Sequence, residues 1–105
     1  MPVNHFLGRE ITVNDEGFLT VPDQWDEELA VVLAKNAGIE ELTDEQWAVI
    51  RFAHQDYRDR GQAPTLRRLN QEGGFDIKQL FAMFPGKPAK KIAYIAGGTK
   101  PVACV

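Results

Sequence analysis

The first part of the chain has short apolar segments separated by turn residues. Apolar side chains gather in residues 3–7 and 11–13, and again at Phe18 and Leu19. Gly17 precedes the last of these segments, at a turn where a positive φ is often needed and glycine adopts it at little steric cost. Short runs between turn signals are typical of antiparallel strands. They predict a small meander built on an N-terminal β-hairpin.

In the rest of the chain, apolar residues recur every three or four positions, the spacing of helices with one buried face. Thr43 and Gln46 can form a capping box at the start of the longest helix, and Gly61 is a typical residue for its end. Pro88 suits the first turn of the last helix, where no N–H donor is needed. The predicted helical regions are 22–38, 43–60, 65–71, 76–83 and 89–95. The fold class is therefore mainly α with a small N-terminal β-hairpin, as a compact helical bundle.

Two of the short helices form a corner that resembles a helix-turn-helix. They are residues 65–71 and 76–83, and Gly73 and Gly74 lie between them. A DNA-binding protein would place the second helix in the major groove, but this helix begins with an acid and offers few side chains that read bases. Small helical domains also make such corners only to pack helices, so DNA binding stays an alternative. The arginines before or within the corner are Arg58, Arg60, Arg67 and Arg68.

The composition is that of an ordinary globular domain. Of the 105 residues, 44% are hydrophobic and 26% are charged, so we expect one domain with a single core. No apolar run approaches the ~20 residues of a membrane helix, and no signal sequence is visible, so we expect a cytoplasmic protein without membrane contact. One cysteine excludes an internal disulfide and a four-cysteine zinc site. No phosphate-binding loop or metal-ligand spacing is present, so we expect no metal and no organic cofactor.

Charge is divided unevenly between the two halves. Residues 1–50 carry two basic and eleven acidic residues, a net charge of −9, whereas residues 51–105 carry ten basic and four acidic residues, a net charge of +6. Such a division can mark a surface that binds nucleic acid or an acidic protein. It equally fits two halves that neutralise each other across the fold, and the sequence leaves both interpretations open.

The single cysteine is the second-to-last residue, in the sequence GGTKPVACV. Cys104 is the only obvious nucleophile of the chain. Gly97 and Gly98 can serve as a hinge, and Lys100 and Pro101 can present the thiol, which an extended arm would carry roughly 25 Å away. A thiol with the ordinary pKa of about 8.5 is little ionised at neutral pH, so we expect activation in a partner's basic pocket. A carrier thiol and a cysteine without function both fit this pattern.

The C-terminal sequence KIAYIAGGTKPVACV resembles the arm of the DsrC/TusE family, whose members end in an Ile-Ala-Gly-x-x-Lys-Pro segment followed by cysteine and one aliphatic residue. Residues 15–19, 25–27 and 42–47 fit the family in order, so the resemblance covers nearly the whole chain. It implies a mainly helical domain over residues 1–96, with an N-terminal β-hairpin, and a mobile arm over residues 97–105.

The resemblance also implies a function. In this family the penultimate cysteine carries sulfur, so Cys104 is expected to accept a sulfane sulfur as a persulfide and to pass it on. The sulfite-reductase type has a second cysteine where this chain has Ala93, so only one-thiol chemistry remains, as in the TusE-like branch. Such a protein is a sulfurtransferase in the broad sense, a carrier more than a stand-alone catalyst. The alternative within the family is a DsrC-like trafficking or regulatory protein of dissimilatory sulfur metabolism.

The partners implied by the resemblance are proteins. We expect a sulfur donor like DsrE or TusBCD, and an acceptor that resembles either a thiouridylase or a sulfite reductase. Contact with tRNA would then be indirect or additional. Five basic residues of the C-terminal half are candidates to contact an acidic donor or the anionic persulfide: Arg67, Arg68, Lys87, Lys90 and Lys91.

Overall fold

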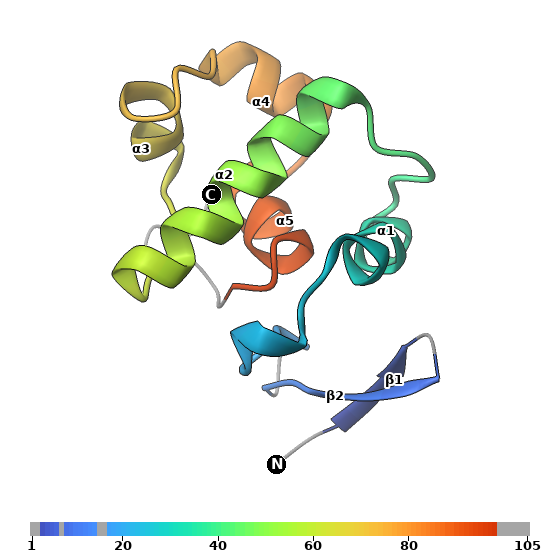
Figure 1. The fold of residues 1–105 in the computed structure, drawn as a ribbon. Helices are drawn as coiled ribbons and strands as arrows, with labels where there is room; N and C mark the ends of the chain where they lie inside the picture. Colours follow the sequence, from blue (N-terminus) through green and yellow to red (C-terminus); the bar gives the residue numbers. More distant parts are fainter. Residues whose placement is uncertain (1–2, 7, 15–16, 99–105) are drawn as a thin grey trace.

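The computed structural model describes residues 3–6, 8–14 and 17–98 and confirms a mainly helical chain with a small N-terminal hairpin. In chain order the elements are β1 (Val3–Phe6), β2 (Arg9–Thr12), the 3-10 helix η1 (Pro22–Gln24), α1 (Glu27–Asn36), α2 (Asp44–Arg60), α3 (Leu66–Gln71), α4 (Ile77–Met83) and α5 (Pro88–Ile95). Figure 1 shows α5 among the other helices, with the hairpin at one end of the molecule. Because α5 contacts α1, α2 and α4, the last helix is the central element of the fold.

The N-terminal meander forms as predicted. β1 and β2 pair antiparallel, and Phe6 lies opposite Arg9. The chain then turns again, so that Val13 forms an isolated bridge with Leu19. Ile11 is buried in a cluster with residues of α1, which holds the hairpin against the helical part. A two-stranded hairpin alone is marginal in water, so this packing stabilises it.

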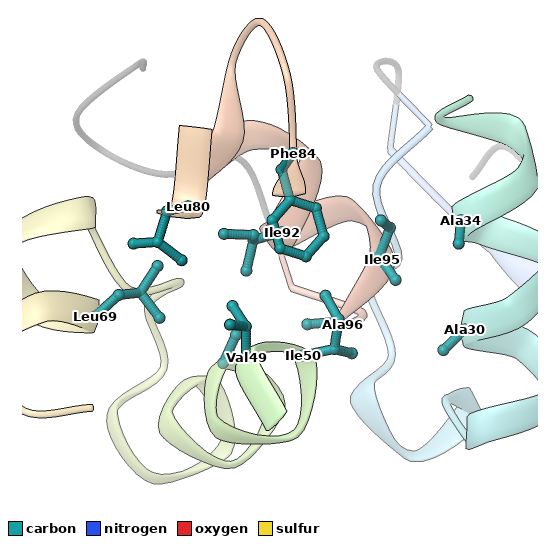
Figure 2. Close-up of a cluster of buried hydrophobic side chains, with 11 residues drawn as sticks. Ala30, Ala34, Val49, Ile50, Leu69, Leu80, Phe84, Ile92, Ile95 and Ala96 are labelled. Atoms are coloured by element: carbon teal, nitrogen blue, oxygen red, sulfur yellow. The ribbon is translucent and has the colours of Figure 1, made fainter. Parts of the chain in front are cut away.

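The main core surrounds α5 and draws side chains from every helix (Figure 2). Phe84, Ile92 and Ile95 face α2 across this core, and Phe84 is fully buried. Burying a large apolar side chain of this kind contributes about 1.5–3 kcal/mol. The core therefore fixes α5 and with it the point where the C-terminal segment leaves the domain. The other buried members are Ala30, Ala34, Val49, Ile50, Ala53, Leu69, Leu80 and Ala96.

Capping residues set the helix boundaries. The capping box of α2 is confirmed, since Thr43 N donates to Gln46 Oε1 at 2.8 Å and Gln46 N donates to Thr43 Oγ1 at 3.2 Å. The prediction of one helical region from residue 22 was wrong. Asp26 has an extended backbone and its carboxylate accepts a hydrogen bond from Leu29 N at 2.8 Å, so α1 begins after it. The residues before Asp26 form only the single 3-10 turn.

The corner between α3 and α4 is present, but its second helix does not have the surface of a DNA reader. Ile77 and Phe81 of α4 are 39% and 42% exposed, so this short helix presents apolar side chains to its surroundings. Between the helices, Gly73 approaches the backbone so closely that an added Cβ would lie 2.7 Å from Leu69 O. The corner is therefore explained by helix packing.

Candidate functional site

The cysteine-bearing segment leaves the domain from a tightly packed turn after α5. Cys104, Lys100 and Pro101 lie outside the described residues. Gly97 and Gly98 are described, and both are buried. Gly98 N donates to the carbonyl of Ala93 at 2.9 Å, which closes the last turn of the helix. The hinge role of the two glycines stays a prediction, because here they belong to the packed domain.

Gly97 is held so closely that no other residue fits. Its φ is +77°, in the left-handed region that favours glycine. A Cβ added at Gly97 would lie 2.5 Å from Cδ1 of Trp25 and 3.0 Å from a methyl carbon of Leu19. This glycine therefore allows the indole of Trp25 to lie directly against the backbone at the root of the C-terminal segment.

Two aromatic side chains, which we call the aromatic clamp, bind the end of α5. Trp25 Nε1 donates to Ile95 O at 2.8 Å, and His54 Nδ1 donates to Ala96 O at 2.8 Å. The two rings stack with centroids 3.9 Å apart and planes inclined by 21°. The last carbonyls of a helix lack partners within the helix, so the clamp satisfies two of them. A carbonyl can only accept, which fixes the neutral His54 in the tautomer that carries its proton on Nδ1.

Sequence analysis missed the role of both clamp residues. His54 is half-buried, and Trp25 packs against two clusters of the core. Their convergence on α5 depends on contacts that span 70 and 42 residues of sequence. No pattern of neighbouring residues in the sequence predicts these long-range contacts. The Trp25-Asp26-Glu27 segment of the family resemblance was the one signal available.

The environment of His54 predicts a pH-dependent stability. Burial is the main influence and lowers the pKa of His54, the hydrogen bond to Ala96 raises it, and Arg58 lowers it by a smaller amount, so the net pKa lies below the ordinary value. The unfolded state then binds more protons as the pH falls past about 6.5. The stability contribution of His54 is therefore complete above this pH and is lost as the pH falls toward the folded-state pKa.

We expect the free energy of unfolding to fall more steeply from about pH 7 to pH 5 in the wild type than in a His54→Asn variant. Asparagine can still donate to Ala96 O but does not titrate, and carboxylate contributions cancel in the comparison. Urea unfolding at each pH would measure both slopes, with His5→Asn added to both chains to remove the other histidine. Equal slopes would contradict the prediction.

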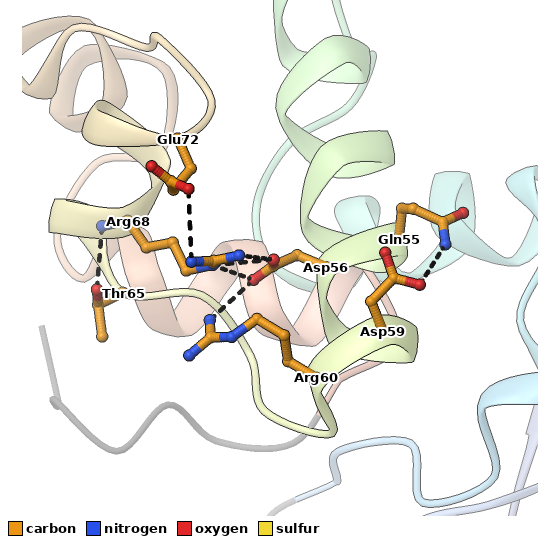
Figure 3. A network of polar contacts seen from close by, with 7 residues as sticks. All are labelled: Gln55, Asp56, Asp59, Arg60, Thr65, Arg68 and Glu72. Carbon is orange, nitrogen blue, oxygen red and sulfur yellow. Dashed lines mark hydrogen bonds and ion pairs between the residues drawn. The ribbon is translucent and has the colours of Figure 1, made fainter.

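Two of the predicted basic residues lie at the α3 end of the fold, where a buried carboxylate holds one of them (Figure 3). The side chain of Asp56 is 6% exposed, and Arg68 approaches it with Nη2 2.8 Å from Oδ1, while Arg60 Nη1 donates to Oδ2 at 3.1 Å. Burial raises the pKa of Asp56, but hydrogen bonds and charge from Arg68 and Arg60 outweigh burial and hold this pKa below its ordinary value. Arg68 is thus bound within the fold, whereas Arg67 is exposed and pairs with no described acid.

The predicted lysines gather at a different place. Lys87, Lys90 and Lys91 lie at and within the start of α5, and together they line a cavity of about 400 Å³. The arginines of α3 line another cavity of about 350 Å³. The structure therefore divides the five predicted basic residues between two places on the domain, and it does not bring them into one site.

The described part of the chain contains no group of three or more histidine, cysteine or acidic side chains that could hold a metal ion. Among its helices, none is both long and apolar enough to cross a membrane.

These features define a small helical protein whose central last helix ends in an anchored turn, after which the chain continues to its single cysteine. The family model described as DsrC like protein matches residues 5–105, and the chain belongs to this family. The membership expected from the C-terminal sequence is thereby confirmed.

Relatives and solved structures agree with this assignment. Sulfurtransferase TusE of Escherichia coli (strain K12) is 40% identical over 108 residues, covering 95% of this chain and 97% of that protein. The NMR structure of Allochromatium vinosum DsrC is 32% identical, covers 98% of this chain and 97% of its own, and superposes with a TM-score of 0.80. A chain in the crystal structure of dissimilatory sulfite reductase I is 31% identical, with coverage of 99% and 100% and a TM-score of 0.82.

The family and its relatives together support a role as a sulfur carrier in a sulfur relay. They do not support the DNA-binding alternative, and the apolar exposed face of α4 gives it no support either. The corner that resembles a helix-turn-helix is present, but DNA binding by it is not supported.

Proposed function

We propose that Cys104 receives a sulfane sulfur from a donor protein and hands it to an acceptor protein. The observation that carries the proposal is the combination of family membership with a single cysteine at the penultimate position. The anchored turn at Gly98 supports it. Cys104 is the sixth residue after Gly98, so an extended segment would reach about 20 Å from the domain surface.

The transfer needs no oxidant or reductant. The thiolate of Cys104 attacks the terminal sulfur of a donor persulfide, a new S–S bond forms on Cys104, and the donor cysteine leaves as a thiolate. In the second step a thiolate of the acceptor attacks the outer sulfur, and Cys104 leaves as a thiolate. Each step breaks one S–S bond and forms another, so the carrier ends as it began.

A second thiol is excluded by the sequence, which has the buried Ala93 of α5 where the sulfite-reductase type has a cysteine. A disulfide within the chain is impossible because there is no other cysteine. This favours a TusE-like relay in the cytoplasm, with a thiouridylase-like acceptor that acts on tRNA, over regulation through two arm cysteines.

Intact-mass spectrometry after incubation with a protein persulfide donor tests the proposal. We expect the wild type to gain one sulfur atom, and the gain to disappear on reduction. The Cys104→Ser variant should gain none, because a serine hydroxyl does not undergo thiol exchange under these conditions. Circular dichroism would show that both chains are folded alike.

Loading alone does not make a carrier, so the purified persulfide form should next be mixed with an acceptor protein that has a free thiol. We expect the acceptor to gain the sulfur that Cys104 loses. Loading of the Cys104→Ser variant, or failure of the wild type to accept sulfur from every donor of a panel, would refute the carrier function for this chain.

A further inference from the structure

A groove beside α5 combines apolar walls with three cationic side chains. It has a volume of about 400 Å³, and we call it the lysine groove. Its lining includes the apolar or aromatic residues Phe18, Pro85 and Tyr94, and the basic residues Lys87, Lys90 and Lys91. These come from the N-terminal meander, from the chain leading into α5 and from α5 itself, so the groove exists only in the folded protein.

The aromatic wall is held in place by the fold. Phe18 is buried, and its ring meets that of Tyr94 edge to face, with centroids 5.8 Å apart and planes at 89°. Tyr94 also accepts a hydrogen bond on its hydroxyl oxygen from Asn36 Nδ2 at 3.3 Å. Since both rings are fixed before any ligand arrives, little ordering is needed on binding.

The lysines of the groove are not used by the fold. None of the three forms an ion pair with a described residue, whereas most of the described arginines do. Lys87 is the N-cap of α5, and Lys90 and Lys91 lie in its first turn, so three like charges gather at the end of the helix where the helix dipole disfavours cations. The repulsion among these lysines is not offset by ion pairs with described acids, and this points to an anion outside the chain as their partner.

We propose that the lysine groove is a docking site for an acidic protein segment in which one apolar side chain is flanked by carboxylates. The apolar side chain would lie against Phe18 and Tyr94, and the carboxylates would pair with the lysines. Charge complementarity favours this occupant, and the apolar lining favours a protein over a nucleic acid, whose phosphates would leave the aromatic wall unused.

The groove lies next to the root of the cysteine-bearing segment. Tyr94 lines the groove, and its carbonyl accepts a hydrogen bond from Gly97 N at 3.4 Å. A protein seated here would have its own surface within reach of Cys104, which raises the effective concentration of the thiol at the partner. That the partner is the donor or acceptor of the relay rests on the proposed function; the docking itself does not.

The test uses the full chain with Cys104→Ser, so that binding is measured without sulfur chemistry and its failure is distinct from failure of the carrier function. The probes are fluorescein-labelled peptides with phenylalanine, leucine or tyrosine between runs of glutamate. We expect at least one to bind in fluorescence anisotropy and to shift the amide NMR signals of Phe18, Ala37 and Tyr94. A central serine should weaken binding about tenfold.

A charge-matched pair of variants locates the site. The K90E/K91E variant should weaken binding about tenfold or more, while R67E/K78E, which removes the same charge at the α3–α4 corner, should change it less than about threefold. The proposal is overturned if no peptide of the panel shifts groove amides, or if both variants weaken binding equally. It is also overturned if the serine peptide, or a single-stranded RNA of equal charge, binds as well as the best peptide.

Discussion

Replacing Gly97 by alanine is expected to destabilise the protein by about 2–5 kcal/mol. Two effects combine. The residue has a φ of +77°, which costs a side chain about 1–2 kcal/mol. The new Cβ would also lie 2.5 Å from the indole of Trp25, which must shift and weaken its hydrogen bond to Ile95. Urea unfolding followed by circular dichroism would measure the loss.

Two other glycines separate these effects. Gly61 has nearly the same φ, +75°, but nothing lies within 4 Å of an added Cβ, so Gly61→Ala should show the backbone cost alone. At Gly98 the nearest atom would be in Tyr57 at 3.4 Å, an ordinary contact, so Gly98→Ala should cost less than about 1 kcal/mol. If Gly97→Ala costs no more than Gly61→Ala, the close approach of Trp25 is not a constraint.

The Gly97 result bears on how the relay works. A thiol carrier needs a free cysteine, but the segment that bears it must start from a defined point if a docked partner is to receive it. The aromatic clamp and Gly97 supply that point at the end of the central helix. In the described structure both glycines belong to that anchored point, and the hinge role expected for the pair stays a prediction.

The features predicted well from the sequence are those decided by a few neighbouring residues. The capping box of Thr43 and Gln46 needs only four consecutive residues, and it forms as expected. The start of α1 was misplaced because two local signals compete, the proline and acid at residues 22–23 and the cap at Asp26. A tertiary contact supports the second, since Arg9 of β2 pairs with Asp26 at 3.0 Å.

The candidate site shows the same limit. The reactive thiol can be predicted from Cys104 and its neighbours in sequence. The roles of the basic residues, in contrast, depend on which acidic side chains the fold brings near them. Arg68 and Asp56 are separated by 12 residues and meet only because α3 packs beside α2. Phe18 reaches the lysines of α5 across most of the chain. The spacing of hydrophobic residues along the chain does not predict such tertiary contacts.

Truncation of Phe84 to alanine is expected to cost about 3–5 kcal/mol, a large part of the stability of a domain of this size. Phe84 has no exposed surface and lies in the main core with Leu80, Ile92 and Ile95 (Figure 2). The backbone N–H of residue 84 would still bond to Leu80 O, so the loss reports packing and not the helix end. Thermal unfolding should show a midpoint lower by more than about 10 °C.

The matched control lies three residues earlier, within α4. Phe81 is 42% exposed, so Phe81→Ala removes the same atoms from a site that the core does not enclose and should cost less than about 1 kcal/mol. Similar losses for the two variants would mean that α4 does not hold Phe84 under α5. Since α5 anchors the C-terminal segment and Gly98 is buried, we also expect Phe84→Ala, but not Phe81→Ala, to speed proteolytic cleavage near Gly98 as the domain opens more often.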